Sequence, residues 1–416
     1  MGAFFRKIIR FFKQNRYYIA IILVFLLIAL IIAGIILGIN QGKEEKQANK
    51  EKIAANEFLQ NVKNLSDGYF YQEAIDLIDN SKYVGKEEVI AFRDELLLKK
   101  DNQKEYNGQV YHVFFHSLIV YPSLAFDGDF MHEGYDMWMT TVSEFKAMLP
   151  QLYERGFVLY NLSDIKEGEK IFLPEGKKPL IISIDDVNYY EYMENDGFSD
   201  RLVVDNDGKI ATEVKTPTGE RVVTYDGDVM PILDAFVKEH PDFSYRGAKG
   251  VVAVTGYEGV FGYNYENESL SEEERNALML KAKEVAQALK NNGWLIACHS
   301  YTHNSYFSDG NVSSEDLNYD TNRFRERTSE WVLNPDIYIS PFGYHLLEGD
   351  ERLKYLKDMG YNYFCPVSPA MRTLFLEEGV VVSERFNLDR YNMRTKKEYI
   401  NETFFDVDSV YYKQSL

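Results

Sequence analysis

The stretch Trp294-Leu-Ile-Ala-Cys-His-Ser-Tyr-Thr-His303 is an apolar run that ends abruptly at two histidines, His299 and His303. Such a run is typical of a buried strand, with the histidines where the chain leaves it. Side chains four residues apart share one side where the backbone turns helically, so both imidazoles could reach one metal ion. Histidines with a structural or surface role are the alternative. A metal site therefore needs a third ligand from elsewhere in the chain.

The composition of the 416-residue chain is that of a globular protein, with 45% hydrophobic and 27% charged residues. The formal net charge of −19 argues against nucleic acid as a partner, because phosphate backbones are bound through clustered Lys and Arg. The only two cysteines, Cys298 and Cys365, exclude a disulfide framework and a cysteine-rich zinc site. We expect both to be small buried thiols.

Residues 17–40, YYIAIILVFLLIALIIAGIILGIN, contain no charged residue and are long enough to cross a membrane as a helix. A cleaved signal peptide would have a shorter apolar region and a small-residue cleavage site, and neither is evident. We predict an uncleaved transmembrane anchor. Residues 1–16 hold basic residues and no acid, so they should be cytoplasmic and the rest of the chain extracytoplasmic. A buried core helix is the alternative.

Residues 41–107 are rich in Lys, Glu, Gln and Asn and carry apolar residues at helical spacing, as in Tyr71 and Ile75. Gly68 and Gly85 divide this region into about three helices. We predict a small helical stalk that spaces the next domain from the membrane, with an unknown partner. A peptide-binding helical repeat is the alternative.

Residues 108–416 alternate short β-rich runs with amphipathic helices, the pattern of parallel strands joined by helical crossovers. Thr141–Glu144 and Ser271–Glu274 fit capping boxes that begin two of the helices. Segment 201–225 differs, because its turn signals predict an antiparallel β-meander inserted after a barrel strand. An α/β fold results, either a parallel barrel or a doubly wound sheet. Besides the strand before His299, strands are expected at 110–116, 157–160, 180–184, 337–340, 361–365 and 380–383.

Asp185 and Asp186 directly follow residues 179–184, which are apolar except for Ser183. Two carboxylates that leave an apolar strand repel each other and are costly to desolvate, so a cation should lie near them. A helix N-cap or a solvated pair in a loop is the alternative. Together with His299 and His303, however, the pair supplies a third metal ligand from a second strand end on the same predicted face.

Residues 110–390 resemble the polysaccharide deacetylase family, the NodB-like domain of carbohydrate esterase family four. Ser183-Ile-Asp-Asp186 resembles its Thr-Phe-Asp-Asp element, and His299-Ser-Tyr-Thr-His303 matches its His-Ser/Thr-x-x-His element. Ile339-Ser-Pro-Phe-Gly343 resembles its Arg-x-Pro-Tyr/Phe element. The resemblance implies a distorted TIM-like (β/α) barrel of the NodB type for the catalytic domain. The anchor and the stalk lie outside it.

The resemblance also implies roles for single residues. Asp186, His299 and His303 would bind a divalent metal, most often zinc, and Asp185 would act as the general base. Three N or O ligands leave positions open, as catalytic zinc requires. The resemblance places an oxyanion-stabilising backbone N–H near Phe342. Residues assigned to substrate or oxyanion contact are Pro341, Phe342 and Tyr301.

Two positions depart from the family pattern. Where the family has the arginine that orients the base, this chain has Ile339. The strand at 380–383 is also not followed by the Leu-x-His that the family has there. Arg385, just after this strand, is a weak candidate for the missing cation. For the acid that protonates the departing amine, we favour His345 over His116, for which a role in the pocket wall is an equal alternative.

The sequence therefore predicts a membrane-anchored, metal-dependent hydrolase that acts on carbon–nitrogen bonds other than peptide bonds. Its substrate would be an N-acetylated, or O-acetylated, polysaccharide of the cell envelope or extracellular space, such as peptidoglycan or poly-N-acetylglucosamine. A glycan-binding pseudoenzyme of the same fold is the alternative, because of the two departures. A hydrolase of another amide or ester would use the same residues.

Overall fold

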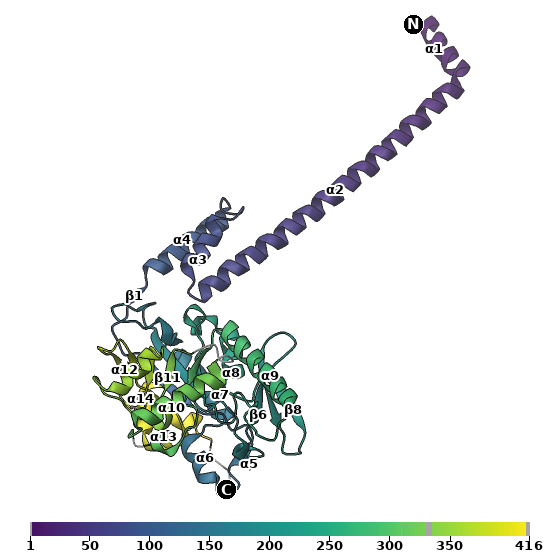
Figure 1. Cartoon of the computed structure of the whole chain (residues 1–416). Coiled ribbons are helices and arrows are strands. Elements are labelled where there is room, and N and C mark those ends of the chain that lie inside the picture. Colours follow the sequence, from purple (N-terminus) through teal and green to yellow (C-terminus); the bar gives the residue numbers. More distant parts are fainter. Residues whose placement is uncertain (1, 309, 330–334, 413–416) are drawn as a thin grey trace. The chain divides into compact units, whose positions relative to one another are not determined.

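The computed structural model describes residues 2–308, 310–329 and 335–412 (Figure 1). The chain divides into two compact units. One unit contains residues 1–64 and 74–93, and the other contains residues 65–73 and 94–416. The two units are described separately below.

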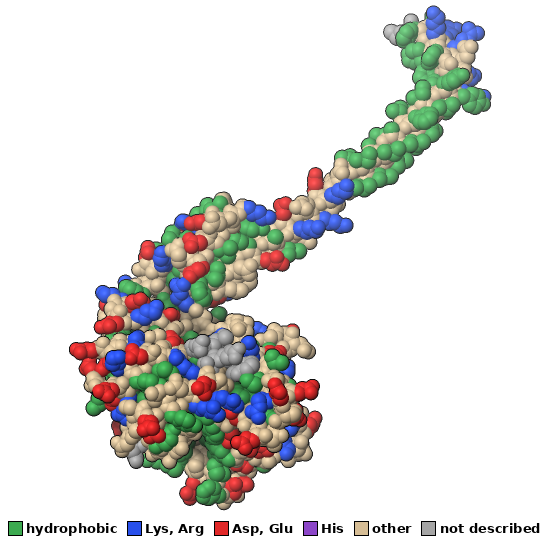
Figure 2. Space-filling view, in the orientation of Figure 1, with side chains coloured by type: hydrophobic (Ala, Val, Ile, Leu, Met, Phe, Trp, Pro, Cys, Tyr) green, Lys and Arg blue, Asp and Glu red, His purple; other side chains and the backbone are tan. Residues whose placement is uncertain are grey.

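The N-terminal residues form two helices, α1 (Gly2–Gln14) and α2 (Arg16–Asp67). The uncharged residues 17–40 lie within α2, which continues without a break into polar sequence and spans 52 residues. The apolar side chains of this stretch are exposed and give α2 a long hydrophobic surface (Figure 2). By length and composition, α2 is able to cross a membrane.

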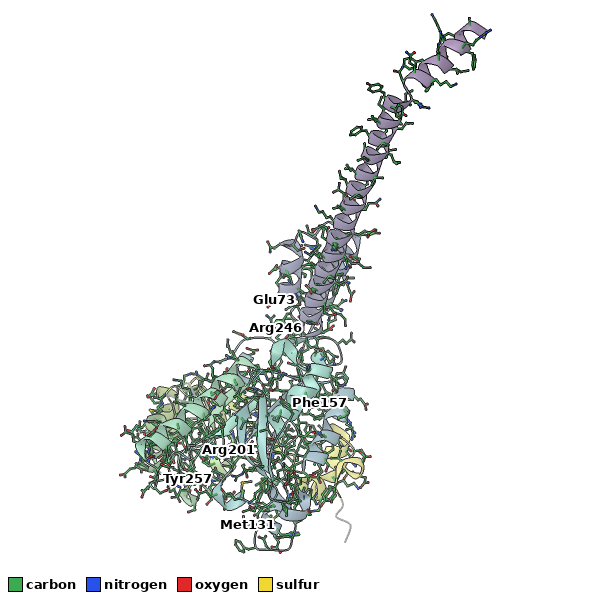
Figure 3. The ribbon with its side chains drawn as sticks, turned by 90° about the vertical axis from the view of Figure 1, so that its right-hand side faces the viewer. Glu73, Met131, Phe157, Arg201, Arg246 and Tyr257 are labelled. Carbon is green, nitrogen blue, oxygen red and sulfur yellow. The ribbon has the colours of Figure 1, made fainter. Side chains whose placement is uncertain are left out.

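Two shorter helices follow, α3 (Tyr71–Asp79) and α4 (Glu87–Asp101), and the breaks before them fall at Gly68 and close to Gly85. Residues 65–73 belong to the larger unit, where Tyr69 Oη donates to the carbonyl oxygen of Asp242 at 2.7 Å. Arg246 also donates to the carboxylate of Glu73 (Figure 3). A stalk domain with bounds at 41 and 107 stays a prediction.

The larger unit is built on a curled half-barrel sheet, to which the described residues contribute ten strands. The hydrogen-bonded order is β13-β14-β12-β11-β10-β9-β5-β2-β15, and β3 pairs with β5 off this path. Every pair is parallel except β13–β14. The carboxyl ends of the parallel strands therefore share one edge of the sheet. The strands are β2 (Tyr111–Phe115), β3 (Phe157–Leu159), β5 (Lys178–Ile184), β9 (Val251–Val254), β10 (Leu295–Cys298), β11 (Ile337–Ile339), β12 (Tyr363–Cys365), β13 (Thr373–Phe375), β14 (Val381–Ser383) and β15 (Phe386–Asn387).

Helical crossovers join these strands and bury apolar side chains against the sheet, as the predicted pattern requires. Both predicted capping boxes form, at the N-termini of α7 and α9. Gly156 ends the first of these helices with a φ of +81°, and a Cβ there would meet the Gly176 carbonyl oxygen at 2.6 Å. The main crossover helices are α7 (Val142–Glu154), α8 (Val229–Glu239), α9 (Glu272–Asn291), α10 (Ser314–Phe324) and α12 (Glu351–Asp358).

The predicted strands are all present, with bounds that differ by a few residues. Strand β9 and helix α8 were not predicted. The run Val251-Val-Ala-Val254 is fully buried between β5 and β10, and four apolar residues are too few for a pattern to separate strand from helix. Cys298 and Cys365 are buried free thiols, as expected.

A separate sheet of three antiparallel strands contains β6 (Ser199–Val204), β7 (Ile210–Lys215) and β8 (Arg221–Thr224). Tight turns at Gly208 and Gly219 connect them, where the N–H of each glycine bonds the carbonyl oxygen three residues earlier. The turn signals therefore identified real hairpins. That the sheet is an insertion into a family fold stays a prediction.

Candidate active site

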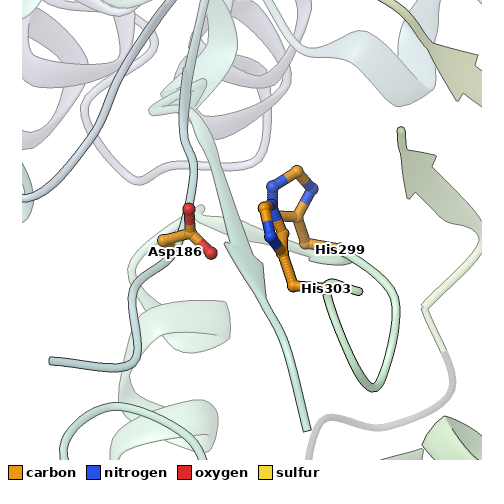
Figure 4. Close-up of side chains that lie close together, drawn as sticks. All are labelled: Asp186, His299 and His303. Atoms are coloured by element: carbon orange, nitrogen blue, oxygen red, sulfur yellow. The ribbon is translucent and has the colours of Figure 1, made fainter. Parts of the chain in front are cut away.

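The two sequence motifs meet at the carboxyl edge of the sheet. Asp185 and Asp186 follow β5, His299 and His303 follow β10, and β9 lies between the two strands. The ligand atoms of Asp186, His299 and His303 lie within 4.8 Å of one another, and Figure 4 shows all three side chains turned toward one space. One carboxylate and two imidazoles are a donor set that suits a divalent metal such as zinc, with small adjustments to reach bonds of about 2.0–2.2 Å.

His299 is prepared for ligation by a backbone carbonyl. The imidazole is buried, and its Nδ1 lies 2.9 Å from the carbonyl oxygen of Ile339, so Nδ1 donates and Nε2 stays free for a metal. Burial lowers the pKa of His299, which favours the neutral imidazole that ligation requires. The main-chain carbonyl of Ile339 thus orients the imidazole of His299.

The loop from His299 to His303 is fixed by buried polar contacts. The carboxylate of Asp320 accepts the N–H of Tyr301 at 2.6 Å and the N–H of Thr302 at 2.9 Å. Ser300 and His303 both have positive φ, at +67° and +45°. Non-glycine residues in this region cost about 1–3 kcal/mol each and persist where the surroundings hold them in place. Sequence patterns gave no signal for Asp320.

Asp186 is held by a tyrosine and kept ionised. Tyr190 Oη donates to Asp186 Oδ1 at 2.6 Å and lies 2.9 Å from Thr255 Oγ1. Burial alone would raise the pKa of Asp186, but the nearby imidazoles of His303, His299 and His116, with the tyrosine hydroxyl, lower it to about 2. The carboxylate is therefore ready to bind a cation at neutral pH.

Replacing Tyr190 with phenylalanine is expected to weaken metal binding by about 10–100-fold, the usual effect of losing a group that orients a metal ligand. The phenyl ring keeps the stacking on Tyr192 and Tyr257, so thermal stability should change little. Competition with a fluorescent zinc chelator measures the affinity. Tyr192→Phe is the matched control, and equal affinities in the two variants would contradict this role for Tyr190.

Asp185 forms a buried ion pair with Arg385. Arg385 Nη1 lies 2.6 Å from Asp185 Oδ1 and 3.1 Å from Ser183 Oγ, while Nε donates to the carbonyl oxygen of Cys365 at 3.2 Å. Burial would raise the pKa of Asp185, but the charge of Arg385, followed by His299 and His116, leaves the pKa below its ordinary value. The carboxylate is thus ionised and oriented, as a general base needs to be.

Arg385 supplies the cation beside Asp185, and position 339 does not, since Ile339 is apolar. It stands in the two-residue link between β14 and β15 and is completely buried. Its guanidinium also covers the ring of Phe114, 4.3 Å from the ring centroid. The sequence signal for this contact is weak, an arginine shortly after an apolar strand.

A pocket of about 470 Å³ opens at this site, a volume suited to a small organic ligand. The proposed metal ligands and Asp185 lie in its wall. Three aromatic side chains that also line it, Trp138, Tyr192 and Phe342, are each about half exposed. Flat aromatic faces next to water are suited to contact with sugar rings.

The structure separates the two candidates for the acid. His116 lines the pocket, and its Nδ1 lies 3.0 Å from the carbonyl oxygen of Trp138, which leaves Nε2 free. His345 is exposed, is not among the described residues that line the pocket, and places Nε2 2.8 Å from the carbonyl oxygen of Val367. The structure therefore brings His116 to the site and does not bring His345, the residue that the sequence analysis favoured.

Of the three residues assigned to substrate or oxyanion contact, one lines the pocket and two do not. Phe342 lines the pocket with a φ of +56°, and its ring centroid lies 4.4 Å from that of His303. Pro341 and Tyr301 are buried, and neither is among the described residues that line the pocket. Tyr301 turns its hydroxyl to Glu266 Oε2 at 3.2 Å.

Four polar residues of the pocket wall were not predicted, Asn387, Asp389, Asn392 and Lys396. Asp389 caps α13 (Arg390–Thr395), where its Oδ1 accepts the N–H of Asn392 at 2.6 Å. Within the described part of the chain, Asp389 Oδ2 and both polar side-chain atoms of Asn387 are buried without a hydrogen-bond partner. Burial raises the pKa of Asp389 to about 7, against the lowering effects of the Asn392 bonds and Arg394.

Replacing Asp389 with asparagine is expected to stabilise the protein at pH 8 by up to about 4 kcal/mol, since a pKa shift of one unit corresponds to about 1.4 kcal/mol. The raised pKa means that the folded state prefers the protonated acid, so wild-type stability falls as pH rises from about 4 to 7. Asparagine keeps the helix cap and cannot ionise.

Thermal unfolding of the wild type and Asp389→Asn at pH 4 and pH 8 measures this effect. The difference in unfolding free energy should be large at pH 8 and small at pH 4. Equal differences at the two pH values would show that the carboxyl group of Asp389 is not perturbed by its burial.

Comparison with known proteins finds similarity only at the level of structure. No family model matches the sequence, and no curated protein matches it. The deacetylase PplD of Streptococcus pyogenes, solved in complex with acetate, is 12% identical and matches with a TM-score of 0.39 over 69% of this chain and 97% of its own. IcaB from Ammonifex degensii is 12% identical and matches with a TM-score of 0.38 over 71% of this chain and 97% of its own.

Proposed function

We propose that this chain is a metal-dependent deacetylase that removes N-acetyl groups from a polysaccharide of the cell envelope or extracellular space. One observation carries the proposal. Three potential metal ligands, Asp186, His299 and His303, converge in a single pocket beside Asp185, an ionised carboxylate that Arg385 orients. A ligand set next to an oriented base is the arrangement that hydrolysis of an amide needs.

Each residue of the pocket has a separate role in the proposed reaction. A divalent metal at the three ligands would polarise the acetamide carbonyl and acidify a water molecule. Asp185 accepts the proton of the attacking water through Oδ2, because Oδ1 is occupied by Arg385. His116, as an imidazolium protonated on both ring nitrogens, gives its Nε2 proton to the departing amine and becomes neutral, while its Nδ1–H donates to the carbonyl oxygen of Trp138. A backbone N–H near Phe342 stabilises the negative charge on the carbonyl oxygen.

The class of substrate follows from the pocket rim and from α2. Trp138, Tyr192 and Phe342 offer exposed ring faces on which pyranose rings can lie. If α2 anchors the chain with residues 1–16 in the cytoplasm, the pocket would lie on the side of the membrane where envelope and extracellular glycans occur. Peptidoglycan and poly-N-acetylglucosamine are the substrates we propose to test first.

The experiment measures acetate released by the detergent-purified full-length protein from chito-oligosaccharides and from peptidoglycan, with added zinc. Asp185→Asn should lower the rate by about 10²–10⁴-fold, the usual contribution of general acid–base catalysis, and leave the metal content unchanged. No acetate from any N- or O-acetylated substrate by a zinc-loaded protein would sink the proposal. Glycan binding that is insensitive to chelator would then favour a pseudoenzyme, the alternative that the absence of Leu-x-His after residues 380–383 supports.

Replacing His116 with alanine is expected to lower the deacetylation rate by about 10²–10⁴-fold, because the departing amine loses its proton donor. His345→Ala is the matched control, an identical substitution outside the pocket, and should keep wild-type activity. Steady-state kinetics on one chito-oligosaccharide compares the two variants. A loss of activity in His345→Ala with none in His116→Ala would reverse the assignment of the acid.

A further inference from the structure

Helix α1 separates its side chains into two faces. At 3.6 residues per turn, the large apolar residues fall on one half of the helix and the basic residues on the other half. The helix contains no acidic residue. The apolar residues are Phe4, Phe5, Ile8, Ile9, Phe11 and Phe12, and the basic residues are Arg6, Lys7, Arg10 and Lys13.

Within the described part of the chain, no other residues pack over the apolar face of α1. No residue of α1 is buried, and Phe4, Phe5 and Phe11 are each more than 60% exposed. Figure 2 shows hydrophobic and basic side chains together on the surface of this helix. A contiguous exposed apolar face of this kind marks a surface that binds something.

The position of α1 identifies what covers this face. Only Asn15 separates α1 from α2, and the apolar stretch of α2 begins at Tyr17. If α2 crosses a membrane, the face of α1 lies at the membrane surface. Basic residues opposite an apolar stripe match the phosphates and acyl chains of anionic lipids.

We propose that α1 lies in the plane of the membrane surface, with its apolar face among the acyl chains and its four cations on anionic lipid headgroups. The proposal rests on α2 as the membrane span, and it does not depend on the chemistry of the pocket. A second copy of α1 fits the face less well, because pairing would bring two sets of four cations together without an acid to neutralise them.

The test places single spin labels on the full-length protein in lipid nanodiscs. Both native cysteines are buried, so introduced cysteines are labelled selectively and the unmodified protein gives the background. The variants Phe5→Cys and Ile9→Cys report on the apolar face, Lys7→Cys and Arg10→Cys report on the basic face, and Leu26→Cys reports on α2. Collisions of each label with oxygen and with a water-soluble nickel complex measure its depth.

We expect the labels on the apolar face, at positions 5 and 9, to collide mainly with oxygen. The labels on the basic face, at positions 7 and 10, should collide mainly with the nickel complex. The label at Leu26 should be inaccessible to nickel. Equal nickel access at all four α1 sites, with Leu26 protected, would overturn the proposal while leaving the anchor intact. Nickel access at Leu26 would overturn the premise and the proposal with it.

A second comparison tests the lipid charge. Nanodiscs of phosphatidylcholine with phosphatidylserine should protect the label at position 9 from nickel better than phosphatidylcholine alone. Changing the four cations of α1 to glutamine should remove this difference. The matched control changes four cations of α2 beyond its apolar stretch, Lys43, Lys46, Lys50 and Lys52, and should keep the difference. Label-to-label distances between two α1 helices that are independent of lipid would identify a second copy as the partner and overturn the proposal.

Discussion

Replacing His303 with alanine is expected to remove bound metal and to lower the deacetylation rate by about 10³-fold or more. The triad would lose one of its three ligands, and with the metal it would lose several kcal/mol of stabilisation of the charge that develops on the carbonyl oxygen. Elemental analysis of the purified variant gives the metal content, and acetate release gives the rate. Both quantities should fall together.

His345→Ala is again the matched control, because it removes an imidazole that is exposed and lies outside the lining of the pocket. This control should retain one metal per chain and wild-type activity. If His303→Ala kept its metal and its activity, the converging side chains would not be a metal site. A fold defect is distinguished by thermal unfolding, which should change little, since His303 is only partly buried.

Replacing Arg385 with methionine is expected to destabilise the metal-free protein by about 3–5 kcal/mol at pH 7. The substitution removes one partner of a buried ion pair and leaves the carboxylate of Asp185 uncompensated in the interior. The double variant Asp185→Asn with Arg385→Met removes the stranded charge as well, so it should recover part of the lost stability.

The pH dependence of Arg385→Met follows from the same pair. In the wild type the pKa of Asp185 is lowered, so its contribution to stability is present above the unfolded pKa and is lost as pH falls through the folded value. Without Arg385 burial dominates and raises the pKa of Asp185, so the variant loses stability as pH rises. Thermal unfolding should therefore show a larger deficit at pH 7 than at pH 4, and an equal deficit at both would contradict the role of this ion pair.

The motifs could be predicted from the sequence because each lies within a few residues of one strand end. Asp186 follows β5 and the histidines follow β10, and the apolar runs before them mark both strands as buried. Parallel strands expose their carboxyl ends at one edge, so local pattern and sheet topology together place these ligands in one site.

Arg385 and His116 could not be assigned in the same way. The contact of Arg385 with Asp185 joins residues 200 positions apart and depends on how the short strand β15 pairs with β2, a register that no sequence pattern specifies. The choice between His116 and His345 depends on side-chain direction after a strand end and after the turn at Pro341–Gly343, where Phe342 has a positive φ. Burial of Asp389 likewise arises only when α13 packs against α6 (His132–Trp138) and α14 (Lys397–Thr403).

Titration of the metal-free protein with zinc tests the central claim most directly. Acetate release should be absent without metal, rise in proportion to added zinc and level off at one zinc per chain, as a single site made by Asp186, His299 and His303 requires. Activity of the metal-free protein equal to that of the zinc-loaded protein would contradict the account.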